Sequence, residues 1–131
     1  MTKIRVLLAD DYPEMIQTVR QALDDGFEIV DAVEDGQKAV DAVLRLNPDV
    51  LLIDISMPVM DGFQATRRLR ELKAQTRIVF LTMHEDRDFV EAALSAGASA
   101  YVTKARLFTD IVPAIRAAVS GQIFVSQTRA K

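Results

Sequence analysis

Five short apolar runs, each followed by a segment with helical periodicity, set the pattern of this 131-residue chain. Apolar runs of about four to eight residues between turn signals are typical of buried strands, and apolar residues about three or four apart are typical of amphipathic helices. The expected strands are residues 4–9, 27–33, 49–54, 77–82 and 99–104. The expected helices are one around residues 16–23, then 37–46, 61–72, 87–96 and a last one ending near residue 120. This alternation predicts an α/β fold, with a parallel sheet covered by helices on both faces.

The last expected helix contains Pro113, which leaves two interpretations open. Proline lacks an amide donor and disfavours helical angles in the residue before it. The helix either begins late, with Asp110 as its cap and Pro113 in its first turn, or is kinked at Pro113; the late start is favoured. Beyond Gly121, the apolar run 123–125 is expected to pack against this helix or to lead into a linker.

Composition and charge narrow the class of protein. Half of the residues are hydrophobic and none is cysteine, which favours one packed domain and excludes disulfides and thiolate metal sites. The formal net charge of −3 argues against a nucleic-acid-binding face, because such faces are usually basic. No apolar stretch reaches the roughly 20 residues needed to cross a bilayer, and the start lacks a secretory signal. A cytoplasmic protein without membrane contact is expected.

Polar residues stand where the expected strands end. They are Asp10, Asp11, Asp54, Thr82 and Lys104. Ligands of doubly wound sheets bind outside the carboxyl ends of the strands, so these side chains are expected to converge. Three carboxylates fit a magnesium ion, and an ammonium and a hydroxyl fit a phosphoryl group. Aspartate itself can accept a phosphoryl group.

Each of these residues also has an ordinary structural explanation. The Asp10-Asp11 pair could cap a helix, and Asp54 could belong to a turn. Lys104 could be a solvated surface lysine, Tyr101 a half-buried strand aromatic, and the single histidine, at position 84, a loop residue. The joint placement of the five polar residues at strand ends favours a functional site.

Four motifs occur in a fixed order along the chain. They are Leu8–Asp11, Asp54–Pro58 followed by Asp61-Gly62, Leu81-Thr82, and Gly97–Lys104. In order and spacing they resemble the response regulator receiver domains of two-component signalling. The segments Leu81–His84 and Ala114–Ala117 are similar to the NarL/LuxR-type subclass, whose members usually carry a C-terminal helix-turn-helix. The resemblance implies a doubly wound five-stranded parallel sheet of flavodoxin-like order 2-1-3-4-5.

The resemblance also implies roles for individual residues. Asp54 is the phosphoacceptor. Asp11, Asp54 and the main-chain carbonyl of Ser56 bind Mg²⁺, and Asp10 contributes largely through water. A further set forms the phosphate-binding and switch group, in which Lys104 and Thr82 contact the phosphoryl group and Thr82 moves together with Tyr101.

At the level of the whole protein, the resemblance implies a phosphorylation switch and not an enzyme beyond its own phosphoryl transfer. A histidine kinase is the expected donor, and phosphorylation is expected to favour a homodimer. Residues 1–121 are expected to form the receiver domain, and residues 122–131 a tail or the start of a linker to an output domain. Transcription control would then belong to that domain, and this chain itself would not bind nucleic acid. The alternative is a stand-alone receiver that acts by protein–protein interaction.

Two residues depart from the family pattern, and two rival functions remain. The first is Pro113, which is unusual for the last helix. Many receivers have a proline after the lysine, whereas Ala105 follows Lys104 here, so the isomer of that bond stays open. A flavin mononucleotide protein would need a Gly/Ser/Thr-rich loop after the first strand, but residues 10–14 are Asp-Asp-Tyr-Pro-Glu, and no G-x-G-x-x-G motif is present. A metal-dependent phosphohydrolase would need a dedicated acid/base beside its acceptor. Both are less favoured.

Overall fold

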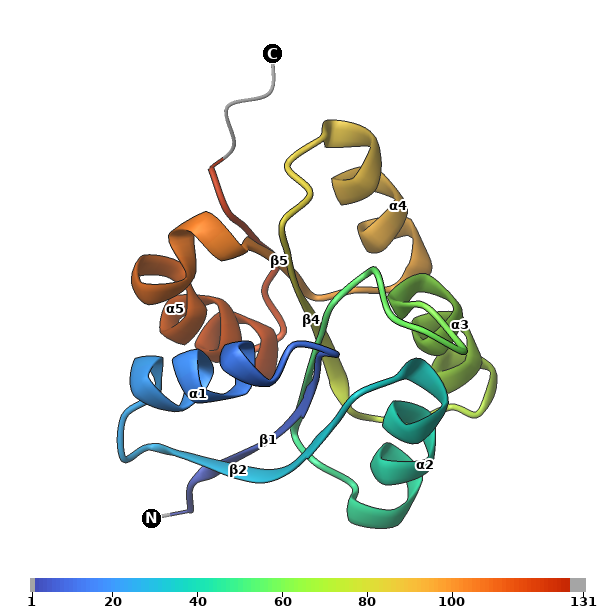
Figure 1. Ribbon diagram of the computed structural model, residues 1–131, viewed down its shortest axis with the longest axis horizontal. Helices are drawn as coiled ribbons and strands as arrows, with labels where there is room; N and C mark the ends of the chain where they lie inside the picture. The colour runs from blue at the N-terminus through green and yellow to red at the C-terminus, as the bar shows by residue number, and fades with distance from the viewer. Residues whose placement is uncertain (1, 128–131) are drawn as a thin grey trace.

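The computed structural model describes residues 2–127, which form one parallel sheet between two layers of helices (Figure 1). The strands are β1 (Ile4–Ala9), β2 (Phe27–Val33), β3 (Val50–Ile53), β4 (Arg77–Thr82), β5 (Ala100–Thr103) and β6 (Phe124–Val125). The helices are α1 (Pro13–Ala22), α2 (Gly36–Leu46), α3 (Gly62–Glu71), α4 (Arg87–Ala96) and α5 (Leu107–Val119), with a 3₁₀ turn at Lys104–Arg106. The strand order is β2-β1-β3-β4-β5-β6. The expected order 2-1-3-4-5 is therefore confirmed, with a short sixth strand added.

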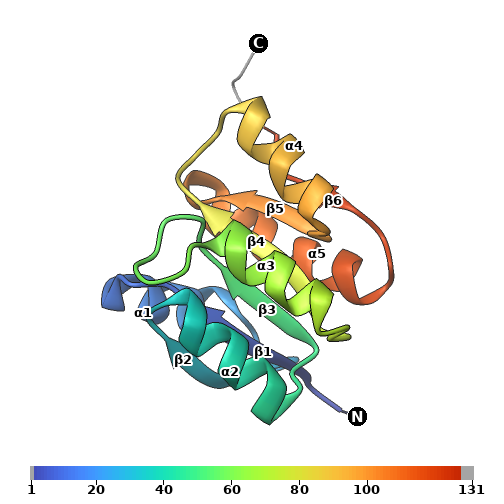
Figure 2. The same ribbon diagram turned by 90° about the vertical axis from the view of Figure 1, so that its right-hand side faces the viewer.

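Helices α1 and α5 cover one face of the sheet, and α2, α3 and α4 cover the other (Figures 1 and 2). Side chains of a strand alternate between the two faces. In β3, Leu51 and Ile53 belong to the core under α2 and α3, while Val50 and Leu52 belong to the core under α1 and α5. All four are fully buried. A strand covered on both faces must be apolar throughout, which explains the uninterrupted run in the sequence.

The loop between β3 and α3 is closed by Asp61 and Gly62. The Asp61 side chain accepts from the Gln64 amide at 2.8 Å, and the Gln64 side chain accepts from the Asp61 amide at 2.9 Å, which makes a capping box. The Gly62 amide donates to the Ile55 carbonyl at 2.8 Å. Together these bonds hold the start of α3 against the end of β3, where Asp54 stands.

Helix α5 differs from the favoured sequence interpretation. It begins at Leu107 and contains Pro113 in its interior, so the late start with Asp110 as cap is wrong. The buried side chains of Leu107 and Ile111 hold the first turns against the sheet. Pro113 and Thr109, whose carbonyl loses its usual helical donor, both lie on the exposed side, where water can satisfy that carbonyl. The bond between Lys104 and Ala105 is trans.

Replacing this proline is expected to stabilise the protein. In Pro113→Ala, the amide of residue 113 can donate to the Thr109 carbonyl, and the helix-interior cost of proline of about 3 kcal/mol is removed. Part of that gain is offset, since proline also restricts the unfolded chain by about 0.4–1 kcal/mol. We expect the free energy of unfolding in urea to rise by about 2 kcal/mol. An unchanged or lower value would contradict this account of α5.

The apolar tail forms β6, which pairs in parallel with β5. The Phe124 amide donates to the Ser99 carbonyl at 3.2 Å, and the Ser126 amide donates to the Tyr101 carbonyl at 2.8 Å. The Phe124 side chain packs against the core cluster that includes α5. Residues 128–131 of the expected tail lie outside the described residues. Within residues 2–127, no helix has the length and apolar character required to cross a bilayer.

Candidate functional site

Asp10 and Asp54 lie side by side, since they follow the neighbouring strands β1 and β3. The Asp54 amide donates to the Ala9 carbonyl at 3.2 Å, which fixes this register. Both side chains are buried, at 2% and 5% exposure. One oxygen of each is held locally: Asp10 Oδ1 accepts from the Tyr12 amide at 2.9 Å, and Asp54 Oδ1 accepts from the Ile55 amide at 2.7 Å. The second oxygen of each is left for other partners.

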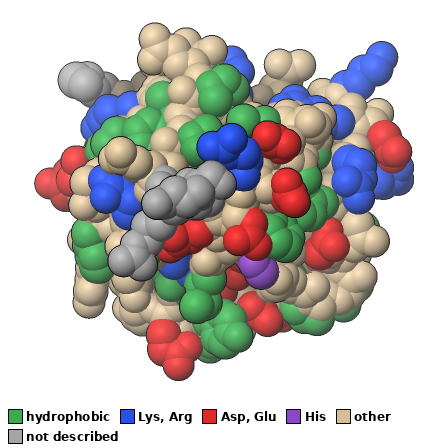
Figure 3. Space-filling model, turned by 90° about the horizontal axis from the view of Figure 1, so that it is seen from above, with side chains coloured by type: hydrophobic (Ala, Val, Ile, Leu, Met, Phe, Trp, Pro, Cys, Tyr) green, Lys and Arg blue, Asp and Glu red, His purple; other side chains and the backbone are tan. Residues whose placement is uncertain are grey.

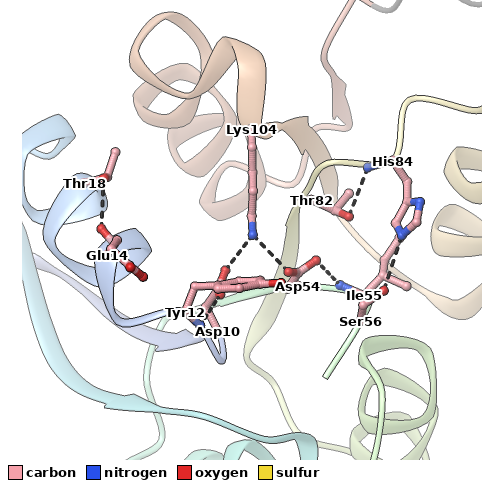
Figure 4. A network of polar contacts seen from close by, with 10 residues as sticks. All are labelled: Asp10, Tyr12, Glu14, Thr18, Asp54, Ile55, Ser56, Thr82, His84 and Lys104. Carbon is pink, nitrogen blue, oxygen red and sulfur yellow. Dashed lines mark hydrogen bonds and ion pairs between the residues drawn. The ribbon is translucent and has the colours of Figure 1, made fainter. Parts of the chain in front are cut away.

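The second oxygen of both carboxylates contacts the same residue, Lys104, which begins the turn after β5. Its Nζ lies 3.0 Å from Asp10 Oδ2 and 3.0 Å from Asp54 Oδ2, and its side chain is only 9% exposed (Figure 4). The Tyr12 ring covers the ammonium group from 5.5 Å. The structure therefore brings together three strand ends that the sequence predicted to converge.

Burial and charge act in opposite directions on these groups. Burial raises the pKa of the Asp10 carboxyl and outweighs the lowering effect of hydrogen bonds from the Tyr12 amide and Lys104. Burial also acts to lower the pKa of Lys104, but its hydrogen bonds to Asp54 and Asp10 and their negative charges prevail and raise it. Lys104 is therefore held as a cation, while the ionised state of Asp10 is disfavoured by its surroundings.

The raised pKa of Asp10 predicts how its removal changes stability. Because the folded state binds a proton at Asp10 more tightly than the unfolded chain, the stability linked to this proton is present below the unfolded pKa and is lost as pH rises through the folded pKa. Asp10→Asn should therefore raise the melting temperature by a few degrees at pH 7 without divalent metal, and the gain should shrink towards acid pH. Thermal unfolding across pH measures this, with the exposed Asp25→Asn as control. A gain that grows on acidification would overturn the assignment.

A third carboxylate, Asp11, completes an acidic triad. One oxygen of Asp10, Asp11 and Asp54 each lies within 4.8 Å of the others, and Asp11 is exposed. In the surface seen from above, Asp and Glu side chains gather around the single histidine, His84 (Figure 3). Three carboxylates face one ammonium group, and hard oxygen ligands of this kind fit a divalent cation. The residues present therefore suit a metal ion such as Mg²⁺.

Thr82 and Tyr101 are linked through the main chain of His84. The Thr82 hydroxyl accepts from the His84 amide at 3.3 Å, and the Tyr101 hydroxyl donates to the His84 carbonyl at 2.8 Å. Both side chains are fully buried, so Tyr101 is not half-buried as strand position alone indicated. Burial, followed by the charges of Asp54 and Asp86, raises the pKa of Tyr101, which stays a neutral donor.

His84 is the residue that sequence reasoning assigned no role. Its Nε2 lies 3.3 Å from Ser56 Oγ, in the loop after Asp54 (Figure 4). Its ring stacks on Phe89 of α4, with centroids 4.3 Å apart. His84 thus contacts both the loop beside the acidic triad and the helix behind it. Nothing in a single sequence indicates these contacts, because they depend on how two loops and a helix meet.

A sequence model described as the response regulator receiver domain matches residues 6–116. The chain belongs to this family. The receiver is a signalling module rather than an enzyme, and its acidic pocket consists of Asp10, Asp11 and Asp54 beside Lys104.

This receiver is close in sequence and structure to receivers of the NarL/LuxR type. The transcriptional regulatory protein DegU of Brevibacillus brevis is 33% identical over 125 residues, covering 94% of this chain and 53% of DegU. The signal receiver domain of the response regulator NarL from Mycobacterium tuberculosis has a TM-score of 0.89 at 31% identity, covering 93% of this chain and all of that one. The isolated receiver of RcsB from Salmonella enterica serovar Typhimurium, solved with the phosphomimetic BeF₃⁻, has a TM-score of 0.87 at 25% identity over 96% of this chain and 95% of that one. This chain spans about half the length of DegU.

Proposed function

We propose that this receiver is a phosphorylation switch in which Asp54 accepts a phosphoryl group from a histidine kinase. The observation that carries the proposal is Lys104 Nζ, held 3.0 Å from Asp54 Oδ2 and 3.0 Å from Asp10 Oδ2. An ammonium group in this place can pair with a carboxylate before transfer and with a phosphoryl group after it. A buried carboxylate that accepts a hydrogen bond from a main-chain amide and lies beside a fixed cation is suited to act as an oriented nucleophile.

The transfer exchanges one bond to phosphorus for another. A carboxylate oxygen of Asp54 attacks phosphorus, and the bond to the donor histidine nitrogen breaks, so that its electron pair returns to the imidazole. The Ile55 amide holds Asp54 Oδ1 at 2.7 Å and fixes the plane of the carboxylate. Asp11, Asp54 and the Ser56 carbonyl would hold Mg²⁺, with Asp10 acting largely through water. When bound, the ion supplies positive charge that offsets the repulsion between phosphate and carboxylates.

The switch follows from the contacts of Thr82 and Tyr101. A phosphoryl oxygen on Asp54 offers the Thr82 hydroxyl a new acceptor. Thr82 and Tyr101 both bond to the main chain of His84, so a shift of Thr82 moves the loop that holds the Tyr101 hydroxyl. The His84 ring carries the shift to α4 through its stack on Phe89. Phosphorylation then favours one of two arrangements of this surface.

The output we propose is control of transcription through a homodimer. DegU and other relatives are named as transcriptional regulators. RcsB, at 25% identity, has been solved as dimers bound to DNA. Phosphorylation of this receiver would shift its equilibrium towards pairing, which would bring two DNA-binding units to neighbouring half-sites.

Magnesium dependence tests the proposal directly. Acetyl phosphate labelling of the protein should require Mg²⁺ and fall to background in excess EDTA, since three carboxylates repel an incoming phosphate. Asp11→Ala should weaken Mg²⁺ binding by about tenfold or more and leave the fold intact, because Asp11 is exposed. Calorimetric titration of Mg²⁺ measures the affinity.

A control separates the site from general charge effects. Asp25→Asn removes an exposed carboxylate that precedes β2, at the opposite end of the strands from the site, and should leave Mg²⁺ affinity and labelling unchanged. Full labelling in EDTA, or an Asp11→Ala protein with wild-type Mg²⁺ affinity, would refute the metal assignment.

A further inference from the structure

The tail strand is tied to the turn that carries Lys104. Beyond its backbone bonds to β5, the tail places Ser126 in the core, at 2% exposure. The Ser126 hydroxyl accepts from the Thr103 amide at 3.2 Å. Thr103 is the last residue of β5 and directly precedes Lys104. The tail therefore holds the main chain one residue away from the lysine that contacts Asp54.

The same hydroxyl donates to a buried carboxylate. Ser126 Oγ lies 2.6 Å from Asp110 Oδ2, and Asp110 is 5% exposed. Arg106, at the end of the 3₁₀ turn, donates to Asp110 Oδ2 from Nε at 2.9 Å and to Oδ1 from Nη2 at 3.4 Å. We call Arg106, Asp110 and Ser126 the tail latch. It joins three segments, namely the turn after β5, helix α5 and the tail.

The tail latch buries a carboxylate, which costs more free energy than the end of a helix requires. A buried carboxylate is unfavourable unless it is fully hydrogen-bonded, and replacing a buried polar network by apolar groups is often neutral or stabilising. Asp110 does not cap α5, since the helix begins three residues earlier at Leu107. The Asp110 carboxylate instead holds both ends of the turn Lys104–Arg106. It is linked to Thr103 through Ser126, and it contacts Arg106 directly.

We propose that Asp110 and Ser126 are positioning residues for Lys104, and that the seating of β6 is thereby coupled to the state of Asp54. The inference rests on the proposed function of Asp54. The lysine stem is flexible, so its ammonium group stays on Asp54 and Asp10 only while the turn below it is anchored. A seated tail favours phosphoryl binding by holding Lys104 in place. By reciprocity, phosphoryl binding favours a seated tail by the same factor.

The affinity for a phosphoryl mimic tests the positioning role. Calorimetric titration of the Mg²⁺-loaded protein with beryllofluoride should give an affinity at least about fivefold weaker for Ser126→Ala than for wild type. Ser120→Ala removes an exposed hydroxyl outside the latch and should leave the affinity unchanged. On a Lys104→Ala background, Ser126→Ala should have no further effect. A merely structural role of Ser126 would instead produce the same loss on both backgrounds.

Amide exchange of the wild-type protein tests the coupling without any substitution. The Phe124 and Ser126 amides donate to the carbonyls of Ser99 and Tyr101, so their exchange reports how firmly β6 is seated. Beryllofluoride should slow their exchange by at least about fivefold, the coupling factor expected above. This measurement also covers the case in which Ser126→Ala fails to fold.

The outcomes separate this inference from the proposed function. If the wild-type protein binds no beryllofluoride, or if the Asp54→Asn protein binds it as tightly as wild type does, the proposed function fails. If wild type binds it but Ser126→Ala binds equally well, or if exchange of the two tail amides does not respond, the tail latch has no part in the switch while Asp54 keeps its role.

Discussion

Asp54→Asn is expected to reduce labelling by acetyl phosphate or a cognate kinase to background, a loss of at least about a hundredfold. The amide has no anionic oxygen to attack phosphorus, and Asp54 is the central carboxylate that Lys104 contacts at the end of β3. Labelling is followed by intact-protein mass, which registers one phosphoryl group per chain.

The fold should survive this substitution. Asparagine keeps the oxygen that can accept from the Ile55 amide, and it removes one negative charge from a buried acidic cluster. Melting temperature in the absence of Mg²⁺ should therefore not decrease. Asp25→Asn, an exposed change of the same chemistry, should label normally. An Asp54→Asn protein that still takes up one phosphoryl group at the wild-type rate would place the acceptor elsewhere.

The second large effect is expected at Gly62, which lies against the main chain of Asp54 and Ile55. A Cβ on this residue would lie 2.3 Å from the Asp54 carbonyl oxygen and 3.0 Å from Ile55 Cα. Both neighbours are backbone atoms, so no side-chain rotation can make room. Gly62→Ala should lower the free energy of unfolding in urea by about 3 kcal/mol and should slow labelling, because relief requires movement of the main chain at Asp54.

Gly26→Ala is the matched control for this change. A Cβ there would meet only Asp24 Oδ1 at 3.1 Å and Arg116 Nη2 at 3.2 Å, the ends of flexible side chains. We expect a change within about 1 kcal/mol and normal labelling. If Gly62→Ala were as mild as Gly26→Ala, the loop after Asp54 would be more adaptable than its contacts with Gly62 indicate.

The elements that the sequence predicted well are those whose signals are local. The β3 run is apolar because both of its faces are covered, and this pattern is visible without knowing which helices cover it. The convergence of the acidic pocket and Lys104 could also be predicted, although Asp10 and Lys104 are far apart in sequence. The carboxyl ends of parallel strands share one edge, so a polar residue after each apolar run is enough to place it there.

Asp110 shows where local reasoning failed. An aspartate three residues before a proline has the pattern of a helix cap and favours a start at Asp110. Burial of the Leu107 and Ile111 side chains favours a helix that begins earlier. Burial prevailed, so α5 begins earlier and encloses Pro113 on its exposed side. Besides the nearby Arg106, Asp110 has a distant partner in Ser126, and the pairing of the tail with β5 brings Ser126 Oγ to 2.6 Å from Asp110 Oδ2.

The sequence by itself determined the α/β class, the edge of the sheet where the acidic pocket lies and the identity of the acidic and basic groups there. Tertiary structure alone decided which atoms pair, as in the link of Thr82 and Tyr101 through His84 and the closure of the tail latch by Ser126. The physical reason is the distance along the chain over which each kind of interaction is set. Strand and helix periodicity are set by neighbouring residues, whereas a hydrogen bond depends on the separation of two atoms whose segments meet only after the core has packed.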